Sequence, residues 1–435
     1  MIETEQPRRL DFKRRRSASI SDSIVADLKS GKNCAVFGPA GSGKSTLIGD
    51  IVESLGGKVA VTATTGIAAL NVGGSTIHSL TGIRTLKSKG DLSFVKDSAS
   101  WQKTKAIIKS LSGLIIDEIS MLRSDTHELV DAVLRDARNS KKPFGGIPTL
   151  VCGDFLQLPP VVMDDEEIPE PWAFQSQLWS ACDFKITALE RVYRQDDARY
   201  IKALREIRVG KCSDSTATMF RSRDGAKIAA AFKPVAFLAK NVQVDEINTN
   251  ELSKLPGKTV CFNAKVTGCD SVAKVKIVRD CIAPEVLHLK MGAQVMILVN
   301  DSQKRFGNGT LGKIVGFENG FPVVKTAKTK HRITFERNTW ESKSPGNQVL
   351  ATLSQIPLKL AYACTIHKSQ GLTLDFAEVD LDGIFAPGQA YVALSRVRSL
   401  EGLVLRNWSR DAIVADEAAL KFVGNGHTWP AEQTQ

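Results

Sequence analysis

The chain has 435 residues, of which 43% are hydrophobic and 24% charged, and its formal net charge is +11. This composition excludes fibrous and disordered proteins, and at about 100–200 residues per domain it predicts two to four domains with cores. The surplus of Lys and Arg favours a polyanionic partner, nucleic acid first and an anionic membrane surface second, although a solubility role alone is the alternative.

No apolar run approaches the ~18 residues of a membrane span, and no signal-peptide pattern opens the chain, so we expect neither membrane insertion nor secretion. The eight cysteines show no C-x-x-C spacing, and several lie in apolar runs, which indicates buried thiols in a reducing compartment. A zinc site built on Cys261, Cys269 and Cys281 is the alternative. The expected location is the cytoplasm (nucleoid) of a bacterium or phage host, or the nucleus or mitochondrion of a eukaryote.

Residues 1–20 form a basic arm that contains "KRRR". A nuclear import signal, a DNA-contacting arm and a solvated run are all compatible with it. Residues 21–185 alternate helical patterns with short apolar segments, and the expected strands are "NCAVF", "KVAVTA", "GLIIDE" and "TLVCGD". Such segments are typical of buried parallel strands, so we predict an α/β domain with a doubly wound parallel sheet and a small insertion near residues 80–105.

A second α/β pattern occupies residues 186–267 and 353–425, beginning with "KITALE" and "KPVAFLAK" and resuming with "KLAYACTIH", "FAEVDL" and "GLVLR". Residues 268–352 between these pieces are β-rich and contain Asn319-Gly320, a strong hairpin signal. The simplest account is a small β-barrel inserted into a second doubly wound domain, with a tail over residues 426–435.

The segment "GPAGSGKS" fits the phosphate-loop pattern G-x-x-x-x-G-K-[ST] and lies between a predicted strand and a predicted helix. Its glycines let backbone N–H groups surround phosphate oxygens, and the helix N-terminus adds positive charge. Lys44 is expected to reach the β- and γ-phosphates, and Ser45 to bind Mg²⁺. The residues predicted to contact the nucleotide here are Gly38, Pro39, Ala40, Gly41, Ser42, Gly43, Lys44, Ser45 and Thr46.

Asp117 and Glu118 follow an apolar strand, at the edge of the sheet where open α/β folds bind ligands. Asp117 suits the coordination sphere of Mg²⁺, and Glu118 suits polarising a water for attack on the γ-phosphate. The two motifs predict a nucleoside-triphosphate hydrolase, a class that kinases, motors, recombinases and helicases share.

The run "GDFLQLPP" places Gln157 just past another strand of the same sheet, where two prolines stiffen the loop. Gln157 is expected to bond the γ-phosphate or its attacking water, and a glutamine that only caps the strand end is the alternative. Arg194 in "LERVYRQ" and Arg396 in "YVALSRVRS" are expected to stabilise charge on the leaving phosphate from across a cleft, although ordinary surface positions would suit both.

These segments, with "TGIAALNVGGSTIHS", "DEISML" and "TIHKSQGLTL", occur in an order that resembles the petite-integration-frequency (Pif) family of superfamily-one DNA helicases, from about Gly31 to Gly402. The resemblance implies an ATP hydrolase with Mg²⁺ that moves 5′ to 3′ on single-stranded DNA and opens DNA forks in replication, repair and recombination. It also implies two RecA-like domains, an SH3-like insertion in the second, and a monomer that meets replication or repair proteins.

Motif by motif, the resemblance places these residues around ATP: Lys44, Ser45, Asp117, Glu118, Gln157, Arg194, Gly371 and Arg396. It places these near the DNA strand: Thr65, Gly66, Thr76, His78, Phe155, Pro159, Asn241, His367, Lys368 and Ser369. Phe155 is expected to stack on bases, and structural core positions are the alternative for the two histidines.

One departure concerns the adenine ring. The family usually carries a glutamine upstream of the phosphate loop, whereas this chain has "SASISDS" there, so a preference for ATP over other triphosphates is not implied. Two rival functions also stay open. One is a DNA-binding or remodelling protein that ATP switches without strand separation, and the other is an RNA-directed motor.

Overall fold

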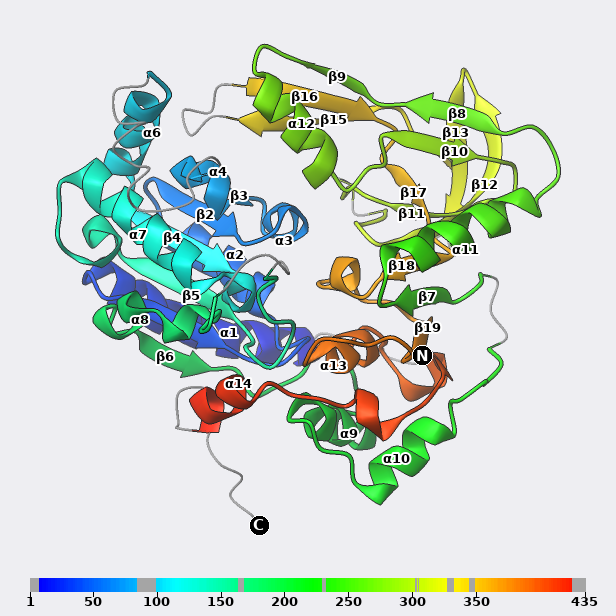
Figure 1. Cartoon of the computed structure of the whole chain (residues 1–435), viewed down its shortest axis with the longest axis horizontal. Coiled ribbons are helices and arrows are strands. Elements are labelled where there is room, and N and C mark those ends of the chain that lie inside the picture. The colour runs from blue at the N-terminus through cyan, green and yellow to red at the C-terminus, as the bar shows by residue number, and fades with distance from the viewer. Residues whose placement is uncertain are drawn as a thin grey trace.

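The computed structural model describes residues 8–83, 99–162, 168–228, 232–301, 303, 305–326, 332–343 and 349–424. Two α/β domains face each other, and a β-rich insertion lies beside them at the upper right of Figure 1. Residues 1–7 of the basic arm, residues 84–98 of the expected small insertion and the tail over 426–435 lie outside the described residues. Helix α1 (Arg8–Lys29) runs through the boundary expected at residue 20.

The first domain is built on a parallel sheet with strand order β3-β2-β4-β5-β1-β6. Its strands are β1 (Cys34–Phe37), β2 (Val59–Ala63), β3 (Ser75–Thr76), β4 (Gly113–Asp117), β5 (Thr149–Gly153) and β6 (Lys185–Ala188). Its helices, besides α1, are α2 (Lys44–Leu55), α3 (Gly66–Asn71), α4 (Ile77–Thr81), α6 (Ala99–Ser110), α7 (Ser124–Arg138) and α8 (Gln177–Ala181).

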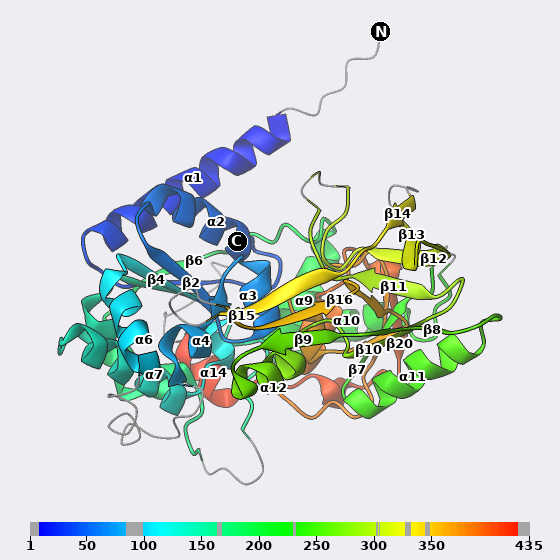
Figure 2. The same cartoon turned by 90° about the horizontal axis from the view of Figure 1, so that it is seen from above.

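Two packed layers of helices bury this sheet. Helices α1 and α2 lie side by side on one face, where Ile24, Leu28 and Ile48 are buried (Figure 2). Helices α6 and α7 cover the other face through residues such as Ile108 and Val133. The four strands predicted from the sequence are therefore confirmed as β1, β2, β4 and β5, because a strand covered on both faces must be apolar along its whole length.

The second domain has a parallel sheet with strand order β18-β7-β19-β20. Its strands are β7 (Val235–Leu238), β18 (Ala363–Thr365), β19 (Ala377–Asp380) and β20 (Leu403–Arg406). Its helices are α9 (Ala198–Arg208), α10 (Asp214–Arg221), α11 (Asn241–Ser253) and α13 (Gln389–Leu394). Helices α9 and α13 pack on one face through Tyr200 and Val392, and α11 packs on the other through Val244.

Two segments differ from the predicted division of the chain. The pattern places "KITALE" in the second domain, but its strand β6 pairs with β1 in the first sheet. The C-terminal helix α14 (Glu417–Phe422) also returns to the first domain, where Ala419 is fully buried in its core. Both errors have one cause. The segments on which β6 and α14 pack lie far away in the sequence, so the local pattern does not show to which domain each element belongs.

The insertion contains three separate antiparallel sheets of five, three and two strands, with orders β14-β13-β12-β11-β17, β15-β16-β9 and β10-β8. Their bounds are β8 (Val260–Asn263), β9 (Lys265–Gly268), β10 (Val286–Leu289), β11 (Gln294–Ile297), β12 (Leu311–Glu318), β13 (Phe321–Thr326), β14 (Arg332–Thr334), β15 (Asn338–Lys343), β16 (Val349–Gln355) and β17 (Leu358–Leu360), with helix α12 (Ser271–Asp280). The insertion therefore begins before residue 268 and ends after residue 352.

The hairpin predicted at Asn319-Gly320 is confirmed between β12 and β13. Both residues have positive φ, 49° and 80°, as a two-residue hairpin turn requires. The SH3-like character of the insertion stays a prediction.

In the described ranges, no helix is long and apolar enough to cross a membrane. All eight cysteines are free. Among its described residues, the structure brings no metal-binding group of three or more His, Cys, Asp or Glu together.

Candidate functional site

The phosphate-loop motif forms the turn between β1 and α2. Gly41 and Gly43 have φ of 79° and 89°, a region that suits glycine, and Gly43 caps the start of α2. The Lys44 ammonium donates to the carbonyls of Gly38 and Pro39 at 2.7 and 3.2 Å, so it lies folded over the loop. The Ser42 hydroxyl is buried and has no hydrogen-bond partner among the residues that the structure describes. A glycine turn with a buried unpaired hydroxyl at a helix N-terminus suits a bound phosphate group.

Two carboxylates lie where β4 ends. Asp117 is almost fully buried, and burial, followed by the charge of Glu118, raises the pKa of Asp117 to about 7. The Asp117 carboxylate accepts only a backbone N–H, from Glu118 at 2.9 Å, among the contacts of the described residues. Glu118 has a φ of 54°, and its carbonyl accepts from the Thr64 hydroxyl at 3.0 Å. A buried carboxylate without a cation fits a divalent metal ion.

Two arginines approach the phosphate loop from the opposite side. Arg194 packs closely against the loop. A Cβ atom added to Gly41 would lie 2.6 Å from the Cβ atom of Arg194. Its guanidinium donates to the Thr373 hydroxyl at 2.9 Å and to the Ser395 carbonyl at 3.0 Å. Arg396 is 2% exposed and donates to the Val392 carbonyl at 2.8 Å.

Neither arginine forms an ion pair within the part of the chain that the structure describes. Burial, followed by the charge of Arg396, lowers the pKa of Arg194 to about 9, and burial also lowers the pKa of Arg396. A buried cation, Arg396, and a half-buried one, Arg194, are costly without an ion-pair partner unless an anion joins them. The cleft beside the phosphate loop is therefore built for a polyanionic ligand.

The loop after β5 is buried and tied to the second domain. The Gln157 amide, 4% exposed, donates to the Asp154 carboxylate at 3.2 Å. Asp154 also accepts from Arg208 of α9 at 2.7 Å, in an ion pair that is buried on both sides. Gly388 at the start of α13 lies so close that a Cβ there would lie 2.3 Å from the Gln157 carbonyl oxygen.

The role predicted for Phe155 as a base-stacking platform is wrong in this structure. Its ring is 1% exposed and packs against Trp172, Phe174 and Phe422 with ring-centre distances of 5.8, 4.9 and 5.3 Å. An apolar ring beside an apolar strand is more stable in the domain core than on a nucleic-acid surface. Phe155 is therefore part of the core surface on which helix α14 packs.

A cavity of about 1020 Å³ lies between the first domain, the second domain and the insertion. The residues of the predicted DNA surface that line it are Thr65, Gly66, Thr76, His78, Asn241 and Lys368. Pro159, His367 and Ser369 do not line it. Ser369 is fully buried, and the His367 ring stacks on Phe385 with ring centres 6.0 Å apart.

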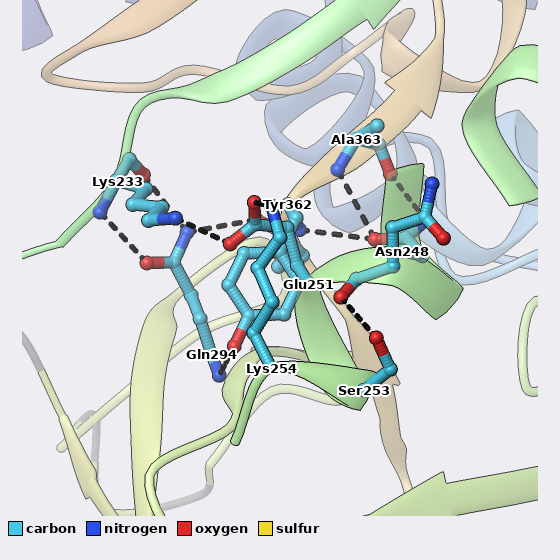
Figure 3. A network of polar contacts seen from close by, with 10 residues as sticks. Lys233, Asn248, Glu251, Ser253, Lys254, Gln294, Tyr362 and Ala363 are labelled. Carbon is cyan, nitrogen blue, oxygen red and sulfur yellow. Dashed lines mark hydrogen bonds and ion pairs between the residues drawn. The ribbon is translucent and has the colours of Figure 1, made fainter. Parts of the chain in front are cut away.

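A polar network fixes the wall of this cavity at the root of the insertion (Figure 3). The Asn248 amide donates to the Ala363 carbonyl at 3.0 Å, and its oxygen accepts the backbone N–H groups of Tyr362 and Ala363 at 3.1 Å. The Tyr362 hydroxyl accepts the backbone N–H of Gln294 at 3.0 Å. These bonds join α11, β18 and β11 into one unit.

Sequence reasoning missed several residues of the cleft. The Gln370 amide donates to the Glu118 carboxylate at 3.0 Å, from the second domain to the first. The Tyr391 hydroxyl accepts the backbone N–H of Ala40 at 2.9 Å, and Gln195 donates to the backbone on both sides of Arg396. Gln195, Gln370 and Tyr391 stand inside recognisable motifs, but their partners lie well over a hundred residues away.

Comparisons with known proteins agree with this arrangement. Residues 14–218 match the model of the PIF1-like helicase family, and residues 275–317 match that of the 2B domain of DNA helicase Pif1. The chain is 38% identical over 408 residues to ATP-dependent DNA helicase PIF1 of Homo sapiens, with 92% of this chain covered. It spans only 62% of the length of that relative. It is 32% identical to ATP-dependent DNA helicase Pif1 of Bdellovibrio bacteriovorus, with 91% of this chain and 89% of the relative covered.

A crystal structure of Pif1 helicase from Bacteroides, in complex with ADP-AlF3 and ssDNA, superposes with a TM-score of 0.69 at 30% identity. The match covers 98% of this chain and 97% of that one. The two parallel α/β domains are thus RecA-like domains. On its motifs, its fold and these matches, the chain belongs to the PIF1-like helicase family.

Proposed function

We propose that the chain is an ATP-dependent DNA helicase that moves 5′ to 3′ on single-stranded DNA and separates duplex strands. The observation that carries this proposal is a pair of arginines beside the phosphate loop, half-buried Arg194 and buried Arg396, which form no ion pair in the described chain. A separate cavity spans the same two domains. The relatives are named ATP-dependent DNA helicases, and the Bacteroides structure holds a nucleotide analogue and ssDNA.

The residues of the cleft divide the work of hydrolysis. The backbone of Gly38–Ser45 and the Lys44 ammonium bind the phosphates of ATP, and Arg194 and Arg396 stabilise the charge that develops on the leaving phosphate. Glu118 accepts a proton from the attacking water, which Gln157 orients. Ser45 and Asp117 would hold Mg²⁺, which offsets negative charge on the phosphate oxygens.

The cavity suits a nucleic-acid backbone. Lys359 of β17 and Lys368 both line it, and burial lowers the pKa of Lys359. Hydroxyl groups of Thr65 and Thr76 and the amide of Asn241 line the same space, and such side chains commonly bond phosphate and sugar oxygens. We therefore place the single strand in this cavity, held mainly through its phosphates.

Movement follows because both sites lie between the same two domains. Closure of the cleft around ATP shifts the second domain and with it Asn241 and Lys368, relative to Thr65 and His78 of the first. Because each domain contacts the strand differently in the closed and open cleft, one cycle of hydrolysis advances the chain along DNA.

Strand separation on forks tests this proposal. The substrates are labelled forks with a 5′ single-stranded tail, forks with a 3′ tail and a blunt duplex, with Mg²⁺ and ATP. We expect separation of the 5′-tailed fork alone, and we expect single-stranded DNA to stimulate ATP hydrolysis more than RNA does. ATP consumption without separation of any fork would instead indicate a DNA-binding switch, and preferential stimulation by RNA would indicate an RNA-directed motor.

A further inference from the structure

A short turn after β18 lies between the cavity and the cleft. Thr365 and Lys368 of this turn line the cavity. The backbone N–H of Lys368 donates to the Thr365 hydroxyl at 3.3 Å, and the Ser369 hydroxyl donates to the Ile366 carbonyl at 2.7 Å. The backbone N–H of Ile366 in turn donates to the Leu238 carbonyl of β7 at 2.9 Å. The turn is therefore one hydrogen-bonded unit, in which a displacement at Lys368 reaches the next residues.

Two residues after Lys368, the turn contacts the catalytic centre of the first domain. The Gln370 side chain is 8% exposed, and its amide nitrogen lies 3.0 Å from the Glu118 carboxylate oxygen Oε2. Gly371, with a φ of 82°, fits so closely that a Cβ there would lie 2.7 Å from the Asn71 amide nitrogen. The turn thus rests directly on the first domain where Glu118 leaves β4.

Glu118 is also held from the cavity side. Its carbonyl accepts the hydroxyl of Thr64, and Thr64 lines the same cavity as Lys368. Glu118 is therefore bonded to Thr64, which lines the cavity, and to Gln370, which lies two residues from Lys368 in the cavity wall. A strand that occupies the cavity would contact Thr64 and Lys368.

The chemistry of the hydrogen bond between Gln370 and Glu118 indicates that it slows hydrolysis. A general base must offer an oxygen lone pair to the proton of water, and it must be free to face the γ-phosphate. An amide N–H that donates to this carboxylate occupies an oxygen lone pair that the proton of water would otherwise use. It also fixes the side chain toward Gln370. In the chain without nucleic acid, this bond restrains Glu118.

We propose that Gln370 is a positioning residue that holds Glu118 back from hydrolysis until a nucleic-acid strand in the cavity moves the Thr365–Gly371 turn and breaks the contact. This inference rests on the proposed function, since it explains how DNA stimulates ATP hydrolysis. The side-chain amide of Gln370 donates to Glu118, so its effect on the reaction passes through Glu118.

Steady-state ATP hydrolysis by the Gln370→Ala variant, with and without saturating oligo-dT, tests the proposal. We expect the DNA-free rate to rise about threefold to tenfold, the size of effect that one hydrogen bond to a side chain produces. The rate with DNA should stay within about twofold of wild type, so that the stimulation ratio falls. The matched control is Gln177→Ala, which makes the same chemical change at an exposed position on α8 and should leave both rates unchanged.

A second variant separates restraint from loss of folding. Gln370→Met removes the donor and keeps a side chain of similar length, so it should raise the DNA-free kcat while the KM for ATP stays within about twofold. A purely structural role would instead lower kcat or raise KM.

The outcomes distinguish failure of the proposed function from failure of the restraint by Gln370. A wild-type chain that hydrolyses ATP without stimulation by DNA would contradict the proposed function. A stimulated wild type whose ratio is unchanged in Gln370→Ala, or whose two rates fall together, would overturn the restraint alone.

Discussion

Two loops of this molecule follow parallel strands and carry a glutamine, yet they stand in different surroundings. In the loop after β5, Gln157 bonds to Asp154 of the same loop, and Asp154 is paired with Arg208 of the second domain. In the turn after β18, Gln370 reaches the first domain and bonds to Glu118, two residues from a lysine that lines the cavity. Residues 154–158 of the first loop are buried, whereas the second turn lies between the cavity and Glu118.

This difference separates two kinds of connection. The loop after β5 joins the domains through a buried ion pair and close packing at Gly388, which stabilises their arrangement. The turn after β18 lies beside the cavity and contacts the Glu118 carboxylate through the hydrogen bond from Gln370, which we propose a ligand can break. A weak contact between two sites is better suited to switching than a strong one, because a ligand can shift it with little binding energy.

The largest expected effect tests whether the two sites are separate at all. Lys44→Ala removes the ammonium that we propose binds the phosphates, so ATP hydrolysis should fall by more than about a thousandfold. Binding to single-stranded DNA should change by less than about twofold and keep its salt dependence, since the cavity residues are intact. The measurements are ATPase assays and fluorescence anisotropy over a salt series. Retained turnover would refute the phosphate site.

A large effect on stability is expected at the loop after β5. Arg208→Gln leaves the Asp154 carboxylate buried without its partner, so the free energy of unfolding in urea should fall by about 3–5 kcal/mol. Arg410→Gln serves as the control, because it breaks an exposed ion pair with Asp214 and should not change stability measurably. If the two variants were equally stable, the structural role of this loop would be wrong.

A smaller effect is expected for the glutamine of the same loop. Gln157→Ala should lower the DNA-stimulated rate of hydrolysis by about tenfold, since the attacking water loses one orienting group. Affinity for single-stranded DNA should change by less than about twofold, because Gln157 does not line the cavity. An unchanged DNA-stimulated rate would show that Gln157 does not sense the nucleotide.

Much of the fold could be predicted because it is encoded locally. The strands β1, β2, β4 and β5 are compact apolar runs between turn residues, and the phosphate loop is a contiguous motif. Pairing between distant segments could not be predicted. Nothing in "KITALE" indicates that β6 lies beside β1, and nothing in "GDFLQLPP" indicates that Phe155 packs on Phe422. One apolar residue looks the same in sequence whether it faces a core or a ligand.

The candidate site follows the same rule. Six residues of the predicted DNA surface line one cavity, because their motifs end at the same edge of the two sheets. The bond between Gln370 and Glu118 spans 252 residues, so only the folded chain reveals it.

The most direct test compares the two glutamines in one assay. ATP hydrolysis by Gln370→Ala and Gln157→Ala would be measured side by side, with and without oligo-dT. We expect that only Gln370→Ala raises the DNA-free rate, whereas Gln157→Ala lowers the DNA-stimulated one. A raised DNA-free rate in Gln157→Ala, with Gln370→Ala equal to wild type, would contradict the claim that the turn after β18 connects DNA to hydrolysis.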